Sequence, residues 1–136
     1  MRTLLALPLL VSCAKPPTAC AEIGCISQLT VHVEGPADPP VGLAGTVTVG
    51  GHEYAVDCDG TSDPEVSCAG SDIVVTITEG GGEVDYGLGS NEPGTEPHGW
   101  SGVDTVTPDW TEDHPNGEDC PSTCWSAEMT AELFVK

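Results

Sequence analysis

Apolar and polar residues alternate along several short stretches of the chain from residue 28 onward. In QLTVHVE (28–34), Leu29, Val31 and Val33 fall on one face of an extended chain, and polar residues fall on the other. A period of two is typical of β-strands that bury one face. Segments rich in glycine and proline, which favour turns, separate the stretches. The alternation therefore predicts an all-β protein.

Two longer stretches are predicted to form β-hairpins. TVTVGGHEYAVDC (46–58) places two β-rich runs around Gly50-Gly51, a pair that tolerates the positive φ angles of tight turns. SDIVVTITEGGGEVDYGLG (71–89) has a triple glycine between two alternating runs. The apolar residues expected to share a face in each run are Ile73, Val75 and Ile77, then Val84, Tyr86 and Leu88.

The last stretch, WSAEMTAELFVK (125–136), is rich in good helix formers. Its apolar residues nevertheless alternate without a break, and the period is the stronger signal, so we predict a strand. WSGVDTVTPDW (100–110) adds a short strand, and the flanking segments are expected to be loops. About seven strands indicate one antiparallel-rich β-sandwich, immunoglobulin-like or transthyretin-like, over residues 25–136.

The first 20 residues follow a different pattern. Arg2 precedes the apolar run LLALPLL (4–10), which is shorter than the roughly 20 residues that span a bilayer. Such a run is typical of a secretory signal peptide. It ends at LVSC (10–13), and Pro16 and Pro17 then favour an extended tether over residues 13–24.

Leu10-Val11-Ser12-Cys13 resembles the lipobox of bacterial lipoproteins. The resemblance implies that residues 1–12 are a signal peptide removed before Cys13. It also implies that the Cys13 sulfur carries a diacylglycerol and the new amino group a further acyl chain, such as palmitate. The lipid bilayer is then the expected partner, and two or more acyl chains anchor a protein stably. Ala14, where enteric inner-membrane lipoproteins have Asp, implies the outer membrane. An ordinary secretory signal is the alternative.

Seven cysteines are an odd number for an exported chain. If lipidation consumes Cys13, six remain, and an exported protein is expected to join them in three disulfides. The disulfide candidates are Cys20, Cys25, Cys58, Cys68, Cys120 and Cys124. The spacings do not match the short repeated pairs of structural zinc sites.

Several pairings of these cysteines remain open. A bridge between Cys58 and Cys68 would close the local loop DGTSDPEVS (59–67). If the first and last strands run parallel side by side, Cys20 and Cys25 could pair with the cysteines of CPSTC (120–124). Otherwise each of these two sets closes on itself.

The layout of the mature chain carries a second resemblance. ACAEIGCISQLTVHV (19–33), a central cysteine pair and HPNGEDCPSTCWSAEMTAEL (114–133) resemble small disulfide-rich envelope lipoproteins of unassigned function. The resemblance implies a compact, disulfide-stapled β-sandwich at the cell envelope, and it brings no known activity.

The chain is strongly acidic. It has 3 Lys and Arg against 22 Asp and Glu, a formal net charge of −19. Removal of residues 1–12 would leave Lys15 and Lys136 as the basic residues and a net charge of −20. Such a charge repels nucleic acid, so nucleic acid is not an expected partner. A solvated acidic surface explains the composition, and a basic envelope protein is a possible partner.

Two acidic segments could offer oxygen ligands. In the loop 57–65, Asp57, Asp59, Asp63 and Glu65 are candidates for calcium, although the EF-hand register fails. The segment 109–119 offers a second set: Asp109, Glu112, Asp113, His114, Glu118 and Asp119. Ordinary turn chemistry explains both segments equally well, so no metal or cofactor is assigned.

No motif indicates catalysis. The Gly-x-Ser-x-Gly elbow of hydrolases is absent, and the four histidines lie in no recognised motif. Trp100 and Trp110, expected in loops, could contact glycan or protein or close the ends of the sandwich. We therefore predict a membrane-anchored envelope lipoprotein, not an enzyme, that acts as a binding or structural module. A calcium-dependent adhesion or ligand-binding domain using loop 57–65 is the alternative, and an envelope hydrolase is the third hypothesis.

Overall fold

The computed structural model describes residues 25–35, 40–91, 99–114 and 123–135. These residues form ten β-strands and no helix, so the prediction of an all-β protein is confirmed. The described residues accordingly contain no helix of the length and apolar character needed to cross a membrane. The strands are β1 (Ser27–Glu34), β2 (Val41–Val49), β3 (His52–Asp57), β4 (Val66–Ala69), β5 (Asp72–Ile77), β6 (Val84–Asn91), β7 (Gly99–Val106), β8 (Thr111–Asp113), β9 (Cys124–Glu132) and β10 (Phe134–Val135).

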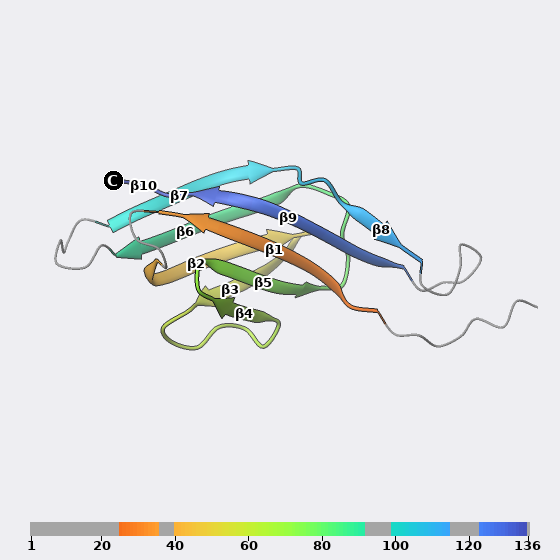
Figure 1. Cartoon of the computed structure of the whole chain (residues 1–136), viewed down its shortest axis with the longest axis horizontal. Coiled ribbons are helices and arrows are strands. Elements are labelled where there is room, and N and C mark those ends of the chain that lie inside the picture. Colours follow the sequence, from red (N-terminus) through yellow and green to blue (C-terminus); the bar gives the residue numbers. More distant parts are fainter. Residues whose placement is uncertain (1–24, 36–39, 92–98, 115–122, 136) are drawn as a thin grey trace, which may run out of the picture.

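The strands form two five-stranded sheets. The order in the first sheet is β4-β5-β1-β9-β8, and in the second it is β10-β7-β6-β2-β3. β1 and β9 pair in parallel, and every other described pair is antiparallel. Figure 1 shows β1 and β9 side by side with their arrowheads at the same end. The first and last long strands are therefore neighbours in one sheet.

One apolar core lies between the two sheets, which gives the protein a sandwich-like architecture. The alternating residues of β1 and β9 contribute to it, with Leu29 and Val31 fully buried. The predicted inward faces of residues 73–77 and 84–88 are also buried. The remaining core members include Leu43, Val47, Val49, Tyr54, Val56, Ala127, Met129, Ala131 and Leu133. Burial of these side chains is the main stabilising contribution.

Two tyrosines connect the sheets at their hydroxyl groups. Tyr54 of β3 is hydrogen-bonded to the backbone of Thr78, just after β5. Tyr86 of β6 is hydrogen-bonded to the backbone of Glu132, at the end of β9. Both rings are buried, and burial raises the pKa of both phenols above the usual value. A buried hydroxyl needs such a partner, so these contacts help to fix how the sheets face each other.

The predicted hairpin at residues 46–58 is confirmed. β2 and β3 pair antiparallel from Val49↔His52 onward, and Gly50 and Gly51 have φ angles of 59° and 78°. Two successive positive φ angles are the geometry of a type I′ turn.

The predicted hairpin at residues 71–89 is wrong. β5 pairs with β1 and β4, whereas β6 pairs with β2 and β7, so the chain crosses from one sheet to the other between them. The connecting glycines pack against two tryptophans: a Cβ on Gly80 would lie 2.7 Å from Cγ of Trp125 and 3.1 Å from Cε3 of Trp110. The glycines thus permit a close approach to the indole rings at one end of the sandwich.

Three further expectations need correction. Trp100 lies in β7 and not in a loop, and the segment expected as a loop from Thr111 begins with the short strand β8. The expected number of strands, about seven, is too low for the ten that the described residues form. The strand expected at 125–136 is confirmed as far as Glu132, where β9 ends, and Phe134–Val135 then form β10 of the other sheet.

Two disulfides join described cysteines. Cys58 and Cys68 are bridged, as the sequence favoured. Cys25, just before β1, is bridged to Cys124, the first residue of β9. The condition set for that pairing, a parallel arrangement of the first and last strands, is met. Cys20 and Cys120 lie outside the described residues.

Candidate functional site

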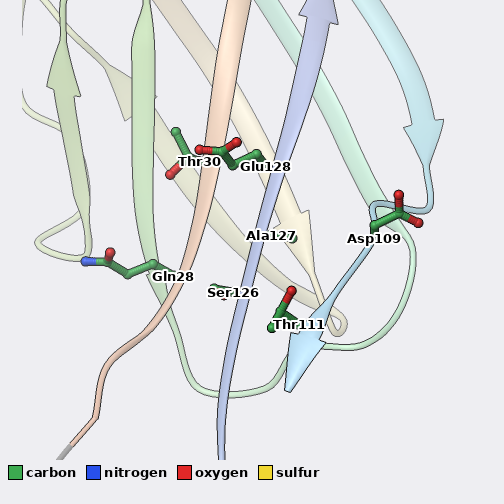
Figure 2. A pocket seen from close by; sticks show the side chains of 7 residues that line it. All are labelled: Gln28, Thr30, Asp109, Thr111, Ser126, Ala127 and Glu128. Atoms are coloured by element: carbon green, nitrogen blue, oxygen red, sulfur yellow. The ribbon is translucent and has the colours of Figure 1, made fainter. Parts of the chain in front are cut away.

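The outer face of the first sheet carries a polar hollow of about 500 Å³. Strands β1, β9 and β8 and the residue Asp109 before β8 surround it. Figure 2 shows the side chains of Thr30 and Glu128 close together, with Asp109 on the other side of β9. The lining residues are Gln28, Thr30, Asp109, Thr111, Ser126, Ala127 and Glu128.

The strand register places the lining side chains. In the parallel pair of β1 and β9, Gln28 lies opposite Ser126 and Thr30 lies opposite Glu128. Since the alternate residues of both strands enter the core, these polar residues share the outer face. Equivalent neighbours on adjacent strands are close enough to act on one ligand.

The short strand β8 leaves space beside β9. β8 pairs only with residues 124–126, from Asp113↔Cys124 to Thr111↔Ser126. The chain leaves the sheet at Trp110, whose indole N–H donates to the carbonyl of Gly82 at 2.8 Å. Asp109 is exposed. The hollow therefore lies where β9 continues past its short neighbour.

A histidine with two carboxylates lies farther along the same face. Nδ1 of His32 is 2.6 Å from Oδ1 of Asp72, which is its antiparallel neighbour on β5. Nε2 of His32 is 3.9 Å from Oε1 of Glu128, which also lines the hollow. The hydrogen bond to Asp72 raises the pKa of His32 most strongly, burial opposes this rise, and the negative charges of Asp72 and Glu128 add smaller upward contributions.

The chemistry of this face is that of a polar binding surface. Hydroxyl, carboxamide and carboxylate groups can accept and donate hydrogen bonds to a hydroxyl-bearing ligand. His32 does not line the hollow, and its side chain is 42% exposed. Both of its ring nitrogens face carboxylates, so His32 is not placed to activate a hydroxyl nucleophile.

One of the predicted calcium residues, Asp63, has another role in the structure, together with its neighbour Ser62. Oδ2 of Asp63 accepts a hydrogen bond from the backbone N–H of Ala55, and Oγ of Ser62 accepts one from the N–H of Asp57. The N–H of Asp63 in turn donates to the carbonyl of Ala55. These bonds make the loop 58–65 a cover for the outer edge of β3. Asp59 and Glu65 are exposed at the surface of this loop.

The described residues of the two acidic segments do not form a metal site. Over the described residues, no three His, Cys, Asp or Glu side chains are placed to hold one ion together. In the second segment, Nε2 of His114 is 3.0 Å from Oε1 of Glu112, and Asp109 lies at the hollow. Asp113 is exposed on β8, and Glu118 and Asp119 lie outside the described residues.

Trp100 and Trp110 were expected either to contact a ligand or to close the ends of the sandwich. Trp100 and Trp110 are both partly buried and pack against the core. Since the Trp110 indole N–H is bonded to Gly82, this ring closes the end of the sandwich. Neither ring lines the hollow.

The polar residues of β1 and β9 were not singled out from the sequence. Their alternation with core residues marked them only as a solvent-facing row. The polar rows of β1 and β9 form one surface because the two strands, about 100 residues apart in the chain, pair in parallel. The local sequence of neither strand indicates this pairing. The candidate lipidation residue, Cys13, lies outside the described residues.

Comparisons with known proteins give no relative for this chain: no family model, curated protein or solved structure matches it.

Proposed function

We propose that the protein is a bacterial envelope lipoprotein, anchored through Cys13 to a membrane, that presents its β-sandwich as a binding or structural module. The observation that carries the proposal is Leu10-Val11-Ser12-Cys13 at the end of a short apolar run. The outer membrane is the proposed address because Ala14 follows the cysteine. We do not assign an enzymatic activity.

The way the chain enters the fold supports an anchored module. Eleven residues, 14–24, separate Cys13 from Cys25, and an extended chain of that length reaches about 35 Å. Cys25 is bridged to Cys124, so a pull on the tether reaches the start of β9 as well as β1. The Ser27 hydroxyl also accepts a hydrogen bond from the Trp125 N–H at 3.0 Å. A pulling force on the tether would therefore be shared by β1 and β9.

The acidic charge fits the same arrangement. Exposed carboxylates at the tether end of the sandwich include Glu79, Glu83, Glu112 and Asp113. Anionic lipid headgroups repel these groups within about a Debye length, roughly 8 Å at physiological salt. The domain would then be held above the bilayer by the tether with its sheet faces free for a partner.

The proposed domain has a third disulfide and a known type of β-sandwich. Cys20 and Cys120 each lie a few residues before Cys25 and Cys124, so a third disulfide between them is consistent with the observed bridge. Two antiparallel-rich sheets around one core also suit an immunoglobulin-like or transthyretin-like sandwich.

The polar hollow is the proposed binding surface, with an envelope glycan as its ligand class. Gln28, Thr111 and Glu128 offer groups that match sugar hydroxyls, and the described lining contains no aromatic ring. The calcium hypothesis has less support, since the carboxylate of Asp63 in the loop 57–65 is engaged in a backbone hydrogen bond. The hydrolase hypothesis gains nothing from His32, whose two ring nitrogens face carboxylates.

Membrane fractionation tests the anchor. We expect the full chain, expressed in a Gram-negative host, to sediment with membranes after a carbonate wash and to partition into detergent. The Cys13→Ala variant should appear in the soluble fraction or as uncleaved precursor, whereas Thr18→Ala, a change within the tether, should behave as wild type. Equal behaviour of Cys13→Ala and wild type would reject the proposal.

A further inference from the structure

Strand β7 has a partly open edge. It pairs with β6 along its whole length, whereas β10 covers only Trp100 and Ser101. The carbonyl of Glu132 at the end of β9 lies against Gly102, which is buried. Across the described ranges, no strand pairs with the other edge of β7 from Val103 to Val106. Figure 1 shows the β7 arrow continuing well past β10. Such an edge is a template on which another extended chain can pair.

The other sheet edges are better protected. Ser62 and Asp63 occupy the backbone groups of Ala55 and Asp57 on β3, at the opposite edge of the same sheet. The edges of the first sheet are the short strands β4 and β8, with four and three residues. Short edge strands offer few backbone groups for pairing. On β7, Asp104 Oδ1 accepts a hydrogen bond from the N–H of Thr105 at 2.8 Å, so the strand's own side chain occupies one of its backbone groups. The other edge groups of Val103–Val106 are available as a template.

A groove of about 320 Å³ follows this open edge. Val103 and Asp104 of β7, Glu132 of β9 and Phe134 of β10 lie along it. Val103 is 85% exposed and Phe134 is 62% exposed, and both belong to the four large apolar residues that the described surface exposes. An exposed apolar pair beside an open edge is unfavourable in water and is typical of a contact surface.

The groove is also acidic. Asp104 and Glu132 are both exposed, and both lie near the hydroxyl of Tyr86. Burial raises the pKa of Tyr86, the backbone hydrogen bond with Glu132 acts against this, and the two negative charges raise it further. No lysine or arginine is present in the described residues, because the three in the chain are Arg2, Lys15 and Lys136. Among the described residues, no lysine or arginine faces Asp104 and Glu132.

We propose that the open edge of β7 is a docking site for an extended, basic segment of a partner protein. The segment would pair with Val103–Val106 as an added strand. Its Lys or Arg side chains would face Asp104 and Glu132, and its apolar side chains would cover Val103 and Phe134. Backbone pairing supplies affinity in this mode of recognition, and alternate side chains supply specificity.

The net negative charge of the chain favours a basic partner over a second copy of this chain as the occupant of the groove. Two copies would each bring a net charge of −19 and would place the same acidic groove against itself. Like charges in close contact oppose association. A basic strand gains from the same field during encounter as well as in the complex.

A peptide titration tests this inference and does not depend on lipidation. The probe is acetyl-Lys-Val-Lys-Val-Lys-Val-Lys-amide, added to the full chain while amide NMR signals are followed. Controls are the matching peptide with Glu in place of Lys and a basic peptide of equal charge with two central prolines, which cannot pair as a strand. We expect binding of the first peptide only, with the largest shifts and slower hydrogen exchange at residues 103–106.

Charge reversal in the groove gives a second readout. Asp104→Lys should weaken binding of the basic peptide about fivefold, since it replaces an attraction with a repulsion. Glu53→Lys makes the same change in net charge on the opposite edge strand, and it should change the affinity less than about twofold. Equal weakening by both variants, or equal binding of the proline peptide, would show only general attraction to an acidic surface and overturn the inference. Self-association of the chain through β7, seen by sedimentation, would overturn it in favour of a second copy.

Discussion

Cys25 and Cys124 are joined by a disulfide that closes a loop of 99 residues and lies at the start of the parallel pair of β1 and β9. The bridge, the hydrogen bond from the Trp125 N–H to Ser27 and the strand pairing all connect the same two segments. The beginning and the end of the described domain are thus held together at one place. That place is also where the predicted tether enters.

Removal of this bridge should show whether a neighbouring disulfide exists. In the chain-entropy model, opening a 99-residue loop costs about 5 kcal/mol of stability, and opening the 10-residue loop of Cys58–Cys68 costs about 3 kcal/mol. If Cys20 and Cys120 are also bridged, the double variant Cys25→Ser with Cys124→Ser opens only a short ring and should cost about 3 kcal/mol. Guanidinium unfolding of this variant and of Cys58→Ser with Cys68→Ser makes the comparison. A loss near 5 kcal/mol would contradict the third disulfide.

The close approach of Gly80 to Trp125 predicts a large effect of one methyl group. Gly80→Ala should destabilise the protein by about 2 kcal/mol, because the added Cβ would lie 2.7 Å from the indole Cγ and force the rings apart. Gly82→Ala is the matched control, since a Cβ there meets nothing within 4 Å and the carbonyl that accepts from Trp110 remains. Chemical unfolding followed by tryptophan fluorescence measures both. Equal stability of the two variants would contradict the packing of this turn.

The pair of His32 and Asp72 predicts a pH dependence of stability. The folded-state pKa of His32 is raised above 6.5, so its contribution is complete below about pH 6.5 and is lost as the pH rises through the higher folded value. Because the pair is well exposed, we expect an effect of only about 2 °C in Tm. Wild type should exceed His32→Gln by this amount at pH 5.5 and by almost nothing at pH 9.

The comparison with His32→Gln at each pH cancels the titration of the many carboxylates. His52→Gln is the control, because His52 is an exposed residue on the other sheet. A difference between wild type and His32→Gln that grows as the pH rises would contradict the sign of this prediction.

Ala14, which follows the candidate lipidated cysteine, predicts in which of the two membranes the protein resides. In an enteric host, Ala14→Asp should move the protein from the outer to the inner membrane, because the resemblance to lipoproteins implies sorting by this position. Ala14→Ser should leave it in the outer membrane. Density-gradient separation of the two membranes with immunodetection measures the distribution. An identical distribution of the Asp and Ser variants would reject sorting at this position.

The strand faces could be predicted from the sequence because alternation is a local signal. Leu29, Val31 and Val33 are buried as expected, and the same is true of Ile73, Val75 and Ile77. The order of the strands could not be predicted in the same way. A hairpin and a crossing between sheets have the same alternation in both strands, so β5 and β6 were wrongly paired with each other. At the crossing between the sheets, Gly80 packs against Trp125, which lies 45 positions later in the chain. Local alternation gives no sign of such a contact.

The candidate site was predictable only in part for the same reason. His32 meets Asp72 from 40 residues away, and Thr30 meets Glu128 only because β1 and β9 run parallel. The acidic loop 57–65 shows the converse. Its composition suggested calcium ligands, but Asp63 and Ser62 are placed to satisfy the edge of β3. Residue types alone do not distinguish a ligand from a backbone cap.

The mass of the intact protein from its native membrane, measured with and without reduction, tests both the lipid anchor at Cys13 and the three disulfides. We expect a chain that begins at Cys13, carries the added mass of its acyl chains and gains six hydrogen atoms on reduction, two for each disulfide. The Cys13→Ala variant should lack the acyl mass and keep the six-hydrogen gain. An unlipidated wild-type chain whose mass is unchanged by reduction would contradict both the anchor and the disulfide framework.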